Sequence, residues 1–288
     1  RHRQRHLADH LCRHCRRDSR RFGAVLQHGA VECDLGPGHH RRSGDGGGGD
    51  RRRGFHGTRF AQDQHPVSPP SGWHEGLLTV QDVSAQLAVA GLAVKPDMQV
   101  LDMCAAPGGK SAQLAQTPLE SLVLLDIYEN RLQKISDLFE RLQLTSNHVQ
   151  FISCDASMPL SAELPQRYDA ILLDAPCSAT GIIRRQPDVK WHRQPKDIDQ
   201  LNTLQWRLLK NAWRYLKPGG RLLYSTCSVL KAENSLLLDS FLKQNTDASA
   251  LPLDAKFGRV SGVGRQRLPG EDGGDGFFYA LLEKYSNE

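Results

Sequence analysis

The stretch that decides the fold is VLDMCAAPGGK, at residues 100–110. A short apolar run ends at Asp102, and small residues then lead into an apolar segment with helical character. Small residues let the backbone approach a ligand closely, and the first turn of a helix offers unpaired N–H groups. The pattern is neither G-x-G-x-x-G nor G-x-x-x-x-G-K-[ST], which disfavours a nicotinamide dehydrogenase and a phosphate-cradling ATPase. It predicts a strand, a ligand-binding turn and a helix.

Short apolar runs and longer amphipathic segments alternate around this stretch, from residue 77 onward. Strands are predicted at 100–103, 122–125, 149–152, 170–173, 222–225 and 277–282. Helices are predicted at 84–93, 111–116, 129–142, 198–216 and 231–244. This alternation is typical of a mostly parallel sheet with helices on both faces. We therefore expect an α/β, Rossmann-like domain over residues 71–288.

Polar residues follow five of the predicted strands. They are Asp102, Asp126, Asp155, Asp174 and the step Thr226-Cys227-Ser228. Ligands of open parallel sheets bind beyond the carboxyl ends of the strands, which places these residues on one rim. A single aspartate there is more simply a helix cap or a turn residue. Together they favour an adenosine-type cofactor, with Asp126 accepting from both ribose hydroxyls and Asp155 near the adenine.

Two cysteines, Cys177 and Cys227, lie on polar loops at the same rim. A buried cysteine usually acts as a small hydrophobe, but a pair on neighbouring loops favours a functional site. A thiolate that adds to carbon 6 of cytosine makes carbon 5 nucleophilic enough to accept a methyl group. Asp174 could hydrogen-bond the amino edge of such a base, which must leave its stack to reach the pocket.

Four motifs together resemble the RNA cytosine-5 methyltransferases of the NOL/NOP/Sun family: DMCAAPGGK at 102–110, DAPCSATGIIRRQPD at 174–188, TCS at 226–228 and LPGEDGGDGFFYA at 268–280. The resemblance covers about residues 75–284. Within the family, IIRRQPDVKW at 182–191 is most similar to bacterial members that act on small-subunit ribosomal RNA.

The resemblance implies the class I fold that binds S-adenosylmethionine, and it implies roles for individual residues. Cys227 would be the nucleophile, Cys177 would help to release the product, and Asp174 would serve the cofactor, the base or both. The residues implied to bind S-adenosylmethionine are Cys104, Ala105, Ala106, Pro107, Gly108, Gly109, Lys110, Asp126, Asp155 and Asp174. No metal site belongs to this set.

Other functions stay open at this point. Pro176-Cys177 also resembles the catalytic dipeptide of DNA cytosine-5 methyltransferases, which would depend on Cys177 instead of Cys227. A tRNA substrate is a further alternative. A non-catalytic RNA-binding or ribosome-assembly protein on the same fold is disfavoured because the motifs are intact at every strand end. A dehydrogenase is the most distant alternative.

Residues 1–60 have a different composition, in which Arg, His and Gly supply 33 positions and Lys, Ile, Asn, Tyr, Trp and Met are absent. Such a segment buries too little apolar surface to offset its ordering entropy, so 1–70 is predicted to be disordered. It is a basic RNA-binding tail, a tag or boundary segment, or a sequence read in the wrong frame where the family's ribosomal members have a helical RNA-binding domain. The last origin explains the missing residue types. Cys12, Cys15, Cys33, His39 and His40 only weakly resemble a zinc site.

The basic charge is unevenly distributed. Residues 1–60 contain 14 Arg and 6 acidic residues, so the other 228 residues carry 23 basic and 26 acidic side chains, a balance of −3. A local basic set with one aromatic follows the Cys177 motif and suits single-stranded RNA, although a solvated face has the same pattern. It consists of Arg184, Arg185, Lys190, Trp191, Arg193 and Lys196. We expect a cytoplasmic, monomeric protein with RNA, most simply small-subunit ribosomal RNA, as its partner and no membrane contact.

Overall fold

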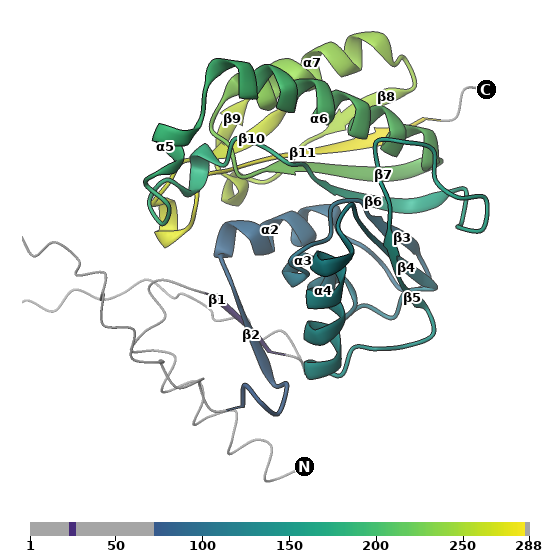
Figure 1. Cartoon of the computed structure of the whole chain (residues 1–288). Coiled ribbons are helices and arrows are strands. Elements are labelled where there is room, and N and C mark those ends of the chain that lie inside the picture. The colour runs from purple at the N-terminus through teal and green to yellow at the C-terminus, as the bar shows by residue number, and fades with distance from the viewer. Residues whose placement is uncertain (1–22, 27–71, 286–288) are drawn as a thin grey trace, which may run out of the picture.

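The computed structural model describes residues 23–26 and 72–285 of the 288-residue chain (Figure 1). Nine strands form the main sheet, in the order β5-β4-β3-β6-β7-β11-β10-β9 with β8 also paired to β11. Their bounds are β3 Gln99–Asp102, β4 Ser121–Asp126, β5 Val149–Ser153, β6 Tyr168–Asp174, β7 Leu216–Thr226, β8 Ala248–Leu251, β9 Arg259–Ser261, β10 Gly264–Arg267 and β11 Phe277–Lys284. Strands β1 (Gly23–Leu26) and β2 (Leu78–Gln81) form a separate antiparallel pair.

Strand direction decides which residues share an edge of the sheet. Strands β3 to β7 are mutually parallel, so all of them end at one edge. Strand β11 runs antiparallel to β7, with Phe278 opposite Thr226. Because of this reversal, the segment that enters β11 lies at the edge where the parallel strands end.

Helices cover both faces of the sheet, as predicted (Figure 1). One face carries α2 (Val83–Leu92), α3 (Gly109–Leu114) and α4 (Glu129–Arg141). The other carries α6 (Pro195–Tyr215) and α7 (Ser235–Gln244). Helix α5 (Val189–His192) is a single exposed turn on the loop between β6 and α6.

The strand cores explain why two helical layers are needed. Adjacent residues in a strand point to opposite faces, and here both faces are apolar. Val100 and Leu172 pack in the cluster with α2, α3 and α4, whereas Leu101 and Ile171 pack in the cluster with α6 and α7. All four side chains are buried. The α/β fold with a mostly parallel sheet is confirmed.

Two predicted element boundaries are wrong for identifiable reasons. The helix expected at 231–244 is divided into a 3-10 turn (Lys231–Glu233) and α7, because Asn234 leaves helical geometry at φ −119° and ψ −106°. Its buried side chain accepts a hydrogen bond from the Thr226 hydroxyl and donates one to the Ser228 carbonyl. These bonds hold Asn234 in its non-helical conformation. Helix α6 begins at Pro195, three residues earlier than expected, because Gln194 and Asp197 form a capping box there.

The expectations for residues 1–70 lie outside the described residues, apart from strand β1, and so does the weak zinc pattern. Across residues 23–26 and 72–285, no group of three or more His, Cys, Asp or Glu side chains could hold a metal ion. In the same residues, no helix is both long enough and apolar enough to cross a membrane.

Candidate functional site

The carboxyl ends of five neighbouring strands assemble the predicted polar rim. Strand β3 ends at Asp102, β4 at Asp126 and β6 at Asp174, which lies opposite Ser225 on β7. Asp155 follows β5 by two residues, and the Cys154 N–H donates to the Asp126 carbonyl over 3.1 Å. The structure therefore brings the predicted aspartates to one edge of the sheet.

Two cysteine loops meet beside this rim. The Sγ atoms of Cys177 and Cys227 lie 3.4 Å apart, and both side chains are half-buried. The N–H of Gly181 donates to the Cys227 carbonyl over 2.8 Å. A Cβ at position 181 would lie 2.0 Å from the Gly276 carbonyl oxygen, so glycine is required where these loops and the segment before β11 meet.

The two thiols are chemically unequal. The hydrogen bond with Cys227 and the burial of the side chain raise the pKa of Cys177 well above its ordinary value. Cys177 therefore keeps its proton at neutral pH, and its S–H can donate to the Cys227 sulfur. The pKa of Cys104 is also raised, chiefly by burial and further by the nearby charges of Asp102 and Asp174. Cys104 is therefore an unreactive thiol.

An ion pair joins the glycine turn to the Cys177 loop. Lys110 Nζ lies 2.6 Å from Asp174 Oδ2, and the Ser225 hydroxyl donates to Asp174 Oδ1 over 2.8 Å. Burial acts to lower the pKa of Lys110, but the charge and the hydrogen bond of Asp174 outweigh it, and the pKa is raised. Lys110 is therefore a fixed cation, 5.2 Å from the centroid of the Phe277 ring.

Asp102 is a buried carboxyl that accepts a side-chain hydrogen bond. The Ser111 hydroxyl donates to its Oδ2 over 2.8 Å, whereas within residues 23–26 and 72–285 its Oδ1 meets no hydrogen-bond donor at normal geometry. Burial raises the pKa of Asp102 from 3.8 to about 7. The group is thus poised between its neutral and charged forms under ordinary conditions.

This raised pKa predicts a pH dependence of stability. Because the folded pKa lies above the unfolded one, the contribution of Asp102 is complete below about pH 4 and is lost as the pH rises through 7. The free energy of unfolding should fall by about 4 kcal/mol from this group across that window. Urea unfolding of the parent and of Asp102→Asn at a series of pH values measures it. Parallel curves for the two proteins would contradict the prediction.

The predicted cofactor turn lies between β3 and α3. Gly108 has φ +99°, and a Cβ there would lie 2.9 Å from the Ile135 side chain, so a larger residue would displace the turn from α4. The Ala105 N–H donates to the Leu125 carbonyl over 2.8 Å, and Arg131 donates to the Ala106 carbonyl over 3.0 Å. These bonds hold residues 104–110 against the end of β4.

The residues at this end of the sheet fit an adenosine-containing cofactor. Asp126 is buried, accepts the Tyr128 N–H over 3.1 Å and lies 3.4 Å from the Arg131 guanidinium. The neighbouring Ile127 and Tyr128 side chains are 53% and 58% exposed. A carboxylate beside exposed apolar surface suits ribose hydroxyls next to a flat base. The Ser157 hydroxyl and N–H hold the pKa of Asp155 below its ordinary value, so this carboxylate is also charged.

The basic segment after Cys177 is more structural than its sequence suggests. Arg185 is ion-paired with the fully buried Asp275, and Arg184 donates to the Gly273 carbonyl over 2.6 Å. Arg193 donates to the Ser178 carbonyl over 2.9 Å. Trp191 is 74% exposed, with Lys190 Nζ 5.0 Å from its ring centroid. The exposed aromatic of this segment thus lies on α5 beside Lys190, and a further exposed cation, Lys196, lies in the first turn of α6.

Sequence reasoning missed a buried polar group behind the two cysteines. Glu233 is fully buried and accepts hydrogen bonds from residues next to both of them, namely Ser178 and Ser228. The sequence offered only a glutamate near the start of the helix predicted at 231–244. No periodicity distinguishes such a residue from a solvated one, because its partners are distant in the chain.

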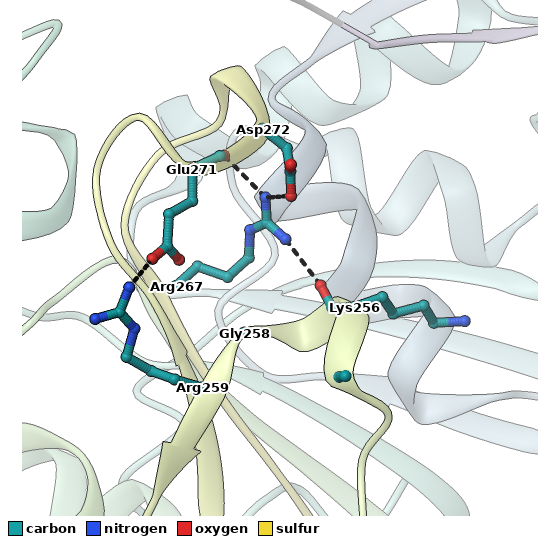
Figure 2. Close-up of a pocket in the computed structure, with 7 residues that line it drawn as sticks. Lys256, Gly258, Arg259, Arg267, Glu271 and Asp272 are labelled. Carbon is teal, nitrogen blue, oxygen red and sulfur yellow. Dashed lines mark hydrogen bonds and ion pairs between the residues drawn. The ribbon is translucent and has the colours of Figure 1, made fainter. Parts of the chain in front are cut away.

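A surface cavity of about 480 Å³ lies away from this site, beside β9 and β10 (Figure 2). Figure 2 shows that its charged groups largely satisfy one another: Arg259 pairs with Glu271, and Arg267 reaches Asp272 and two carbonyls. The Lys256 side chain points away from them. The cavity therefore offers no free cluster of charge.

Comparisons with known proteins show the family. Residues 89–283 match the family model described as 16S rRNA methyltransferase RsmB/F. The chain is 50% identical over 222 residues to the ribosomal RNA small subunit methyltransferase B of Xanthomonas campestris pv. campestris, covering 77% of this chain and 51% of that protein. The chain thus spans about half the length of the curated relatives that it matches.

Solved structures show the same fold. A methyltransferase homolog protein from Pyrococcus horikoshii is 34% identical, with a TM-score of 0.65 over 76% of this chain and 72% of that one. NSun6 from Pyrococcus horikoshii, solved with SFG, is 27% identical, with a TM-score of 0.69 over 77% of this chain and 56% of that one.

Proposed function

We propose, because the chain belongs to the 16S rRNA methyltransferase RsmB/F family, that it methylates carbon 5 of a cytosine in RNA, with 16S ribosomal RNA as the substrate. The observation that carries the proposal is the pair of sulfur atoms 3.4 Å apart at the polar rim of the sheet. One cysteine serves to add to carbon 6 of the base, which removes the 5,6 double bond, and the second serves in the elimination that restores this double bond.

The reaction begins at Cys227. Its thiolate adds to carbon 6 of the base, forming a C–S bond and moving an electron pair toward carbon 5. When bound, S-adenosylmethionine supplies the electrophilic methyl group that carbon 5 accepts. Carbon 5 then loses its proton to solvent acting as the base, the electron pair of that C–H bond restores the double bond between carbons 5 and 6, and the C–S bond breaks with its electron pair leaving on the Cys227 sulfur. Cys177 is placed beside the departing sulfur, 3.4 Å from it in the structure, and the assignment of the nucleophile to Cys227 follows the resemblance to the family.

The other residues of the site bind the cofactor and orient the base and the RNA strand. Residues 104–110, Asp126, Asp155 and Asp174 hold the cofactor in this proposal, and Asp174 also accepts a hydrogen bond from the amino group that identifies cytosine. Lys110 fixes the orientation of Asp174 through the 2.6 Å ion pair. Trp191 and Lys190 supply stacking and a phosphate contact for a single strand. A ribosomal RNA substrate implies a cytoplasmic protein, and the monomeric state stays a prediction.

A covalent adduct tests the proposal directly. With Cys177→Ala, small-subunit ribosomal RNA that lacks the modification and S-adenosylmethionine, we expect a protein–RNA species that survives denaturing electrophoresis, because the adduct forms but is not released. The double variant Cys177→Ala, Cys227→Ala is the matched control and should show none. Absence of the adduct while calorimetry shows cofactor binding would refute the covalent proposal for this RNA. An adduct formed by the single variant Cys227→Ala, which keeps Cys177, would point to the DNA-type assignment instead.

A further inference from the structure

The carboxylate of Glu233 is buried without a countercharge. Its side chain is fully excluded from solvent, and among residues 23–26 and 72–285 no Lys, Arg or His forms an ion pair with it. Removing an ionised carboxylate from water is costly unless hydrogen bonds replace the lost hydration. Four neutral donors replace the lost hydration of Glu233 by hydrogen bonds.

The four donors come from both sides of the thiol pair. Glu233 Oε1 accepts the Ser178 N–H over 2.8 Å and the Gln205 amide over 3.0 Å. Its Oε2 accepts the Ser178 hydroxyl over 2.6 Å and the Ser228 hydroxyl over 2.5 Å. Ser178 follows Cys177 directly, and Ser228 follows Cys227. One carboxylate therefore binds the residue next to each cysteine.

A second contact fixes the other side of Cys177. The Gln205 side chain, on α6, also donates to the Pro176 carbonyl over 2.8 Å. Cys177 is thus held between Pro176, bound by Gln205, and Ser178, bound by Glu233. Neither partner touches a sulfur atom, so the effect on the thiols is one of placement.

We propose that Glu233 is a positioning residue that clamps the two cysteine loops together and sets the separation of their sulfur atoms for the successive addition and release steps. The inference rests on the proposed function, since it assigns each half of the clamp to one step. The Ser228 half holds Cys227 for addition to the base, and the Ser178 half holds Cys177 for release of the product. The negative charge of Glu233 also helps to keep Cys177 protonated.

The clamp predicts a loss of rate without a loss of binding. In the Cys177→Ala background, Glu233→Gln should slow adduct formation about 100-fold, because a misplaced reacting group costs a factor of that order. Ser228→Ala should slow the same step. The dissociation constants of cofactor and RNA should stay at the parent values. In steady-state assays of Glu233→Gln and Ser228→Ala with both cysteines present, KM should stay at the parent value as well. With both cysteines present, Ser178→Ala should accumulate adduct that the parent releases.

The controls separate placement from folding. Asp169→Asn removes a carboxylate that accepts three hydrogen bonds at the opposite edge of the sheet, and it should leave both rates unchanged. Ser178→Ala and Ser228→Ala each remove one hydroxyl and preserve a test if Glu233→Gln does not fold. Thermal unfolding of every variant identifies a general loss of structure.

The outcomes distinguish the clamp from the reaction itself. If the Cys177→Ala parent forms no adduct, the proposed function fails and the clamp fails with it. If that parent forms adduct and the folded Glu233→Gln and Ser228→Ala variants form it at the same rate, only the clamp is overturned. A fall in melting temperature with an unchanged adduct rate also overturns it, because the residue would then be merely structural.

Discussion

Cys227→Ala is expected to lower methyl transfer to RNA by at least about 1,000-fold, because removal of a covalent nucleophile leaves only binding and orientation. The base would then have to accept a methyl group at a carbon that is not activated. Incorporation of radiolabelled methyl from S-adenosylmethionine into ribosomal RNA measures the loss. Cofactor affinity, measured by calorimetry, should be unchanged, since Cys227 does not belong to the residues that hold the cofactor in the proposal, which include the turn at residues 104–110.

The matched comparison is Cys177→Ala, which should fail in a different way. It should incorporate about one methyl group per protein molecule and then stop, because the product remains attached to Cys227. Repeated turnover by Cys227→Ala, or complete inactivity of Cys177→Ala with a dependence on Cys177 for addition, would reverse the two assignments.

Asp174→Asn is expected to give the second large effect, a loss of about 100-fold or more in kcat/KM. An uncharged amide cannot hold Lys110 over 2.6 Å as a carboxylate does, and its N–H would face the amino group of cytosine. Lys110 would also be left largely buried without a countercharge, which costs about 3–5 kcal/mol when one partner of such a pair is removed. Activity assays and urea unfolding measure the two losses separately.

A double-mutant cycle with Lys110→Met isolates the ion pair. The double variant Lys110→Met, Asp174→Asn should recover stability relative to Asp174→Asn, because no buried cation remains, while activity should stay low. Recovery of activity in the double variant would show that Asp174 acts only as the partner of Lys110 and has no role toward the base.

Periodicity and motif position predicted the fold well because they depend on local sequence. The run at 100–110 gave β3, the turn and α3 within two residues, and the apolar strands gave a sheet covered on both faces. The rim could be predicted for the same reason, since strand ends are local and parallel strands share an edge. The strand ends also predicted that Cys177 and Cys227 lie at the same rim, but the 3.4 Å separation of their sulfur atoms depends on loop contacts that the sequence does not specify.

What escaped prediction depends on contacts between distant residues. Glu233 is buried only because Ser178 and Gln205 arrive from other elements, and Asn234 breaks the expected helix for a similar reason. Arg185 looked like an RNA contact because its partner Asp275 lies 90 residues away. Strands β9 and β10 were missed because residues such as the 71% exposed Val260 follow no clear apolar alternation.

The segment between Arg185 and Arg193 has a consequence for protein engineering. Both ends are tethered to the site, by Arg185 to Asp275 and by Arg193 to the Ser178 carbonyl, while α5 between them has no buried residue. Residues 186–192 therefore form a cassette that can be recoded, lengthened or exchanged between homologues with little strain on the thiol pair. If α5 contacts RNA as proposed, exchanging this segment should change substrate preference more than it changes the separation of the two sulfur atoms.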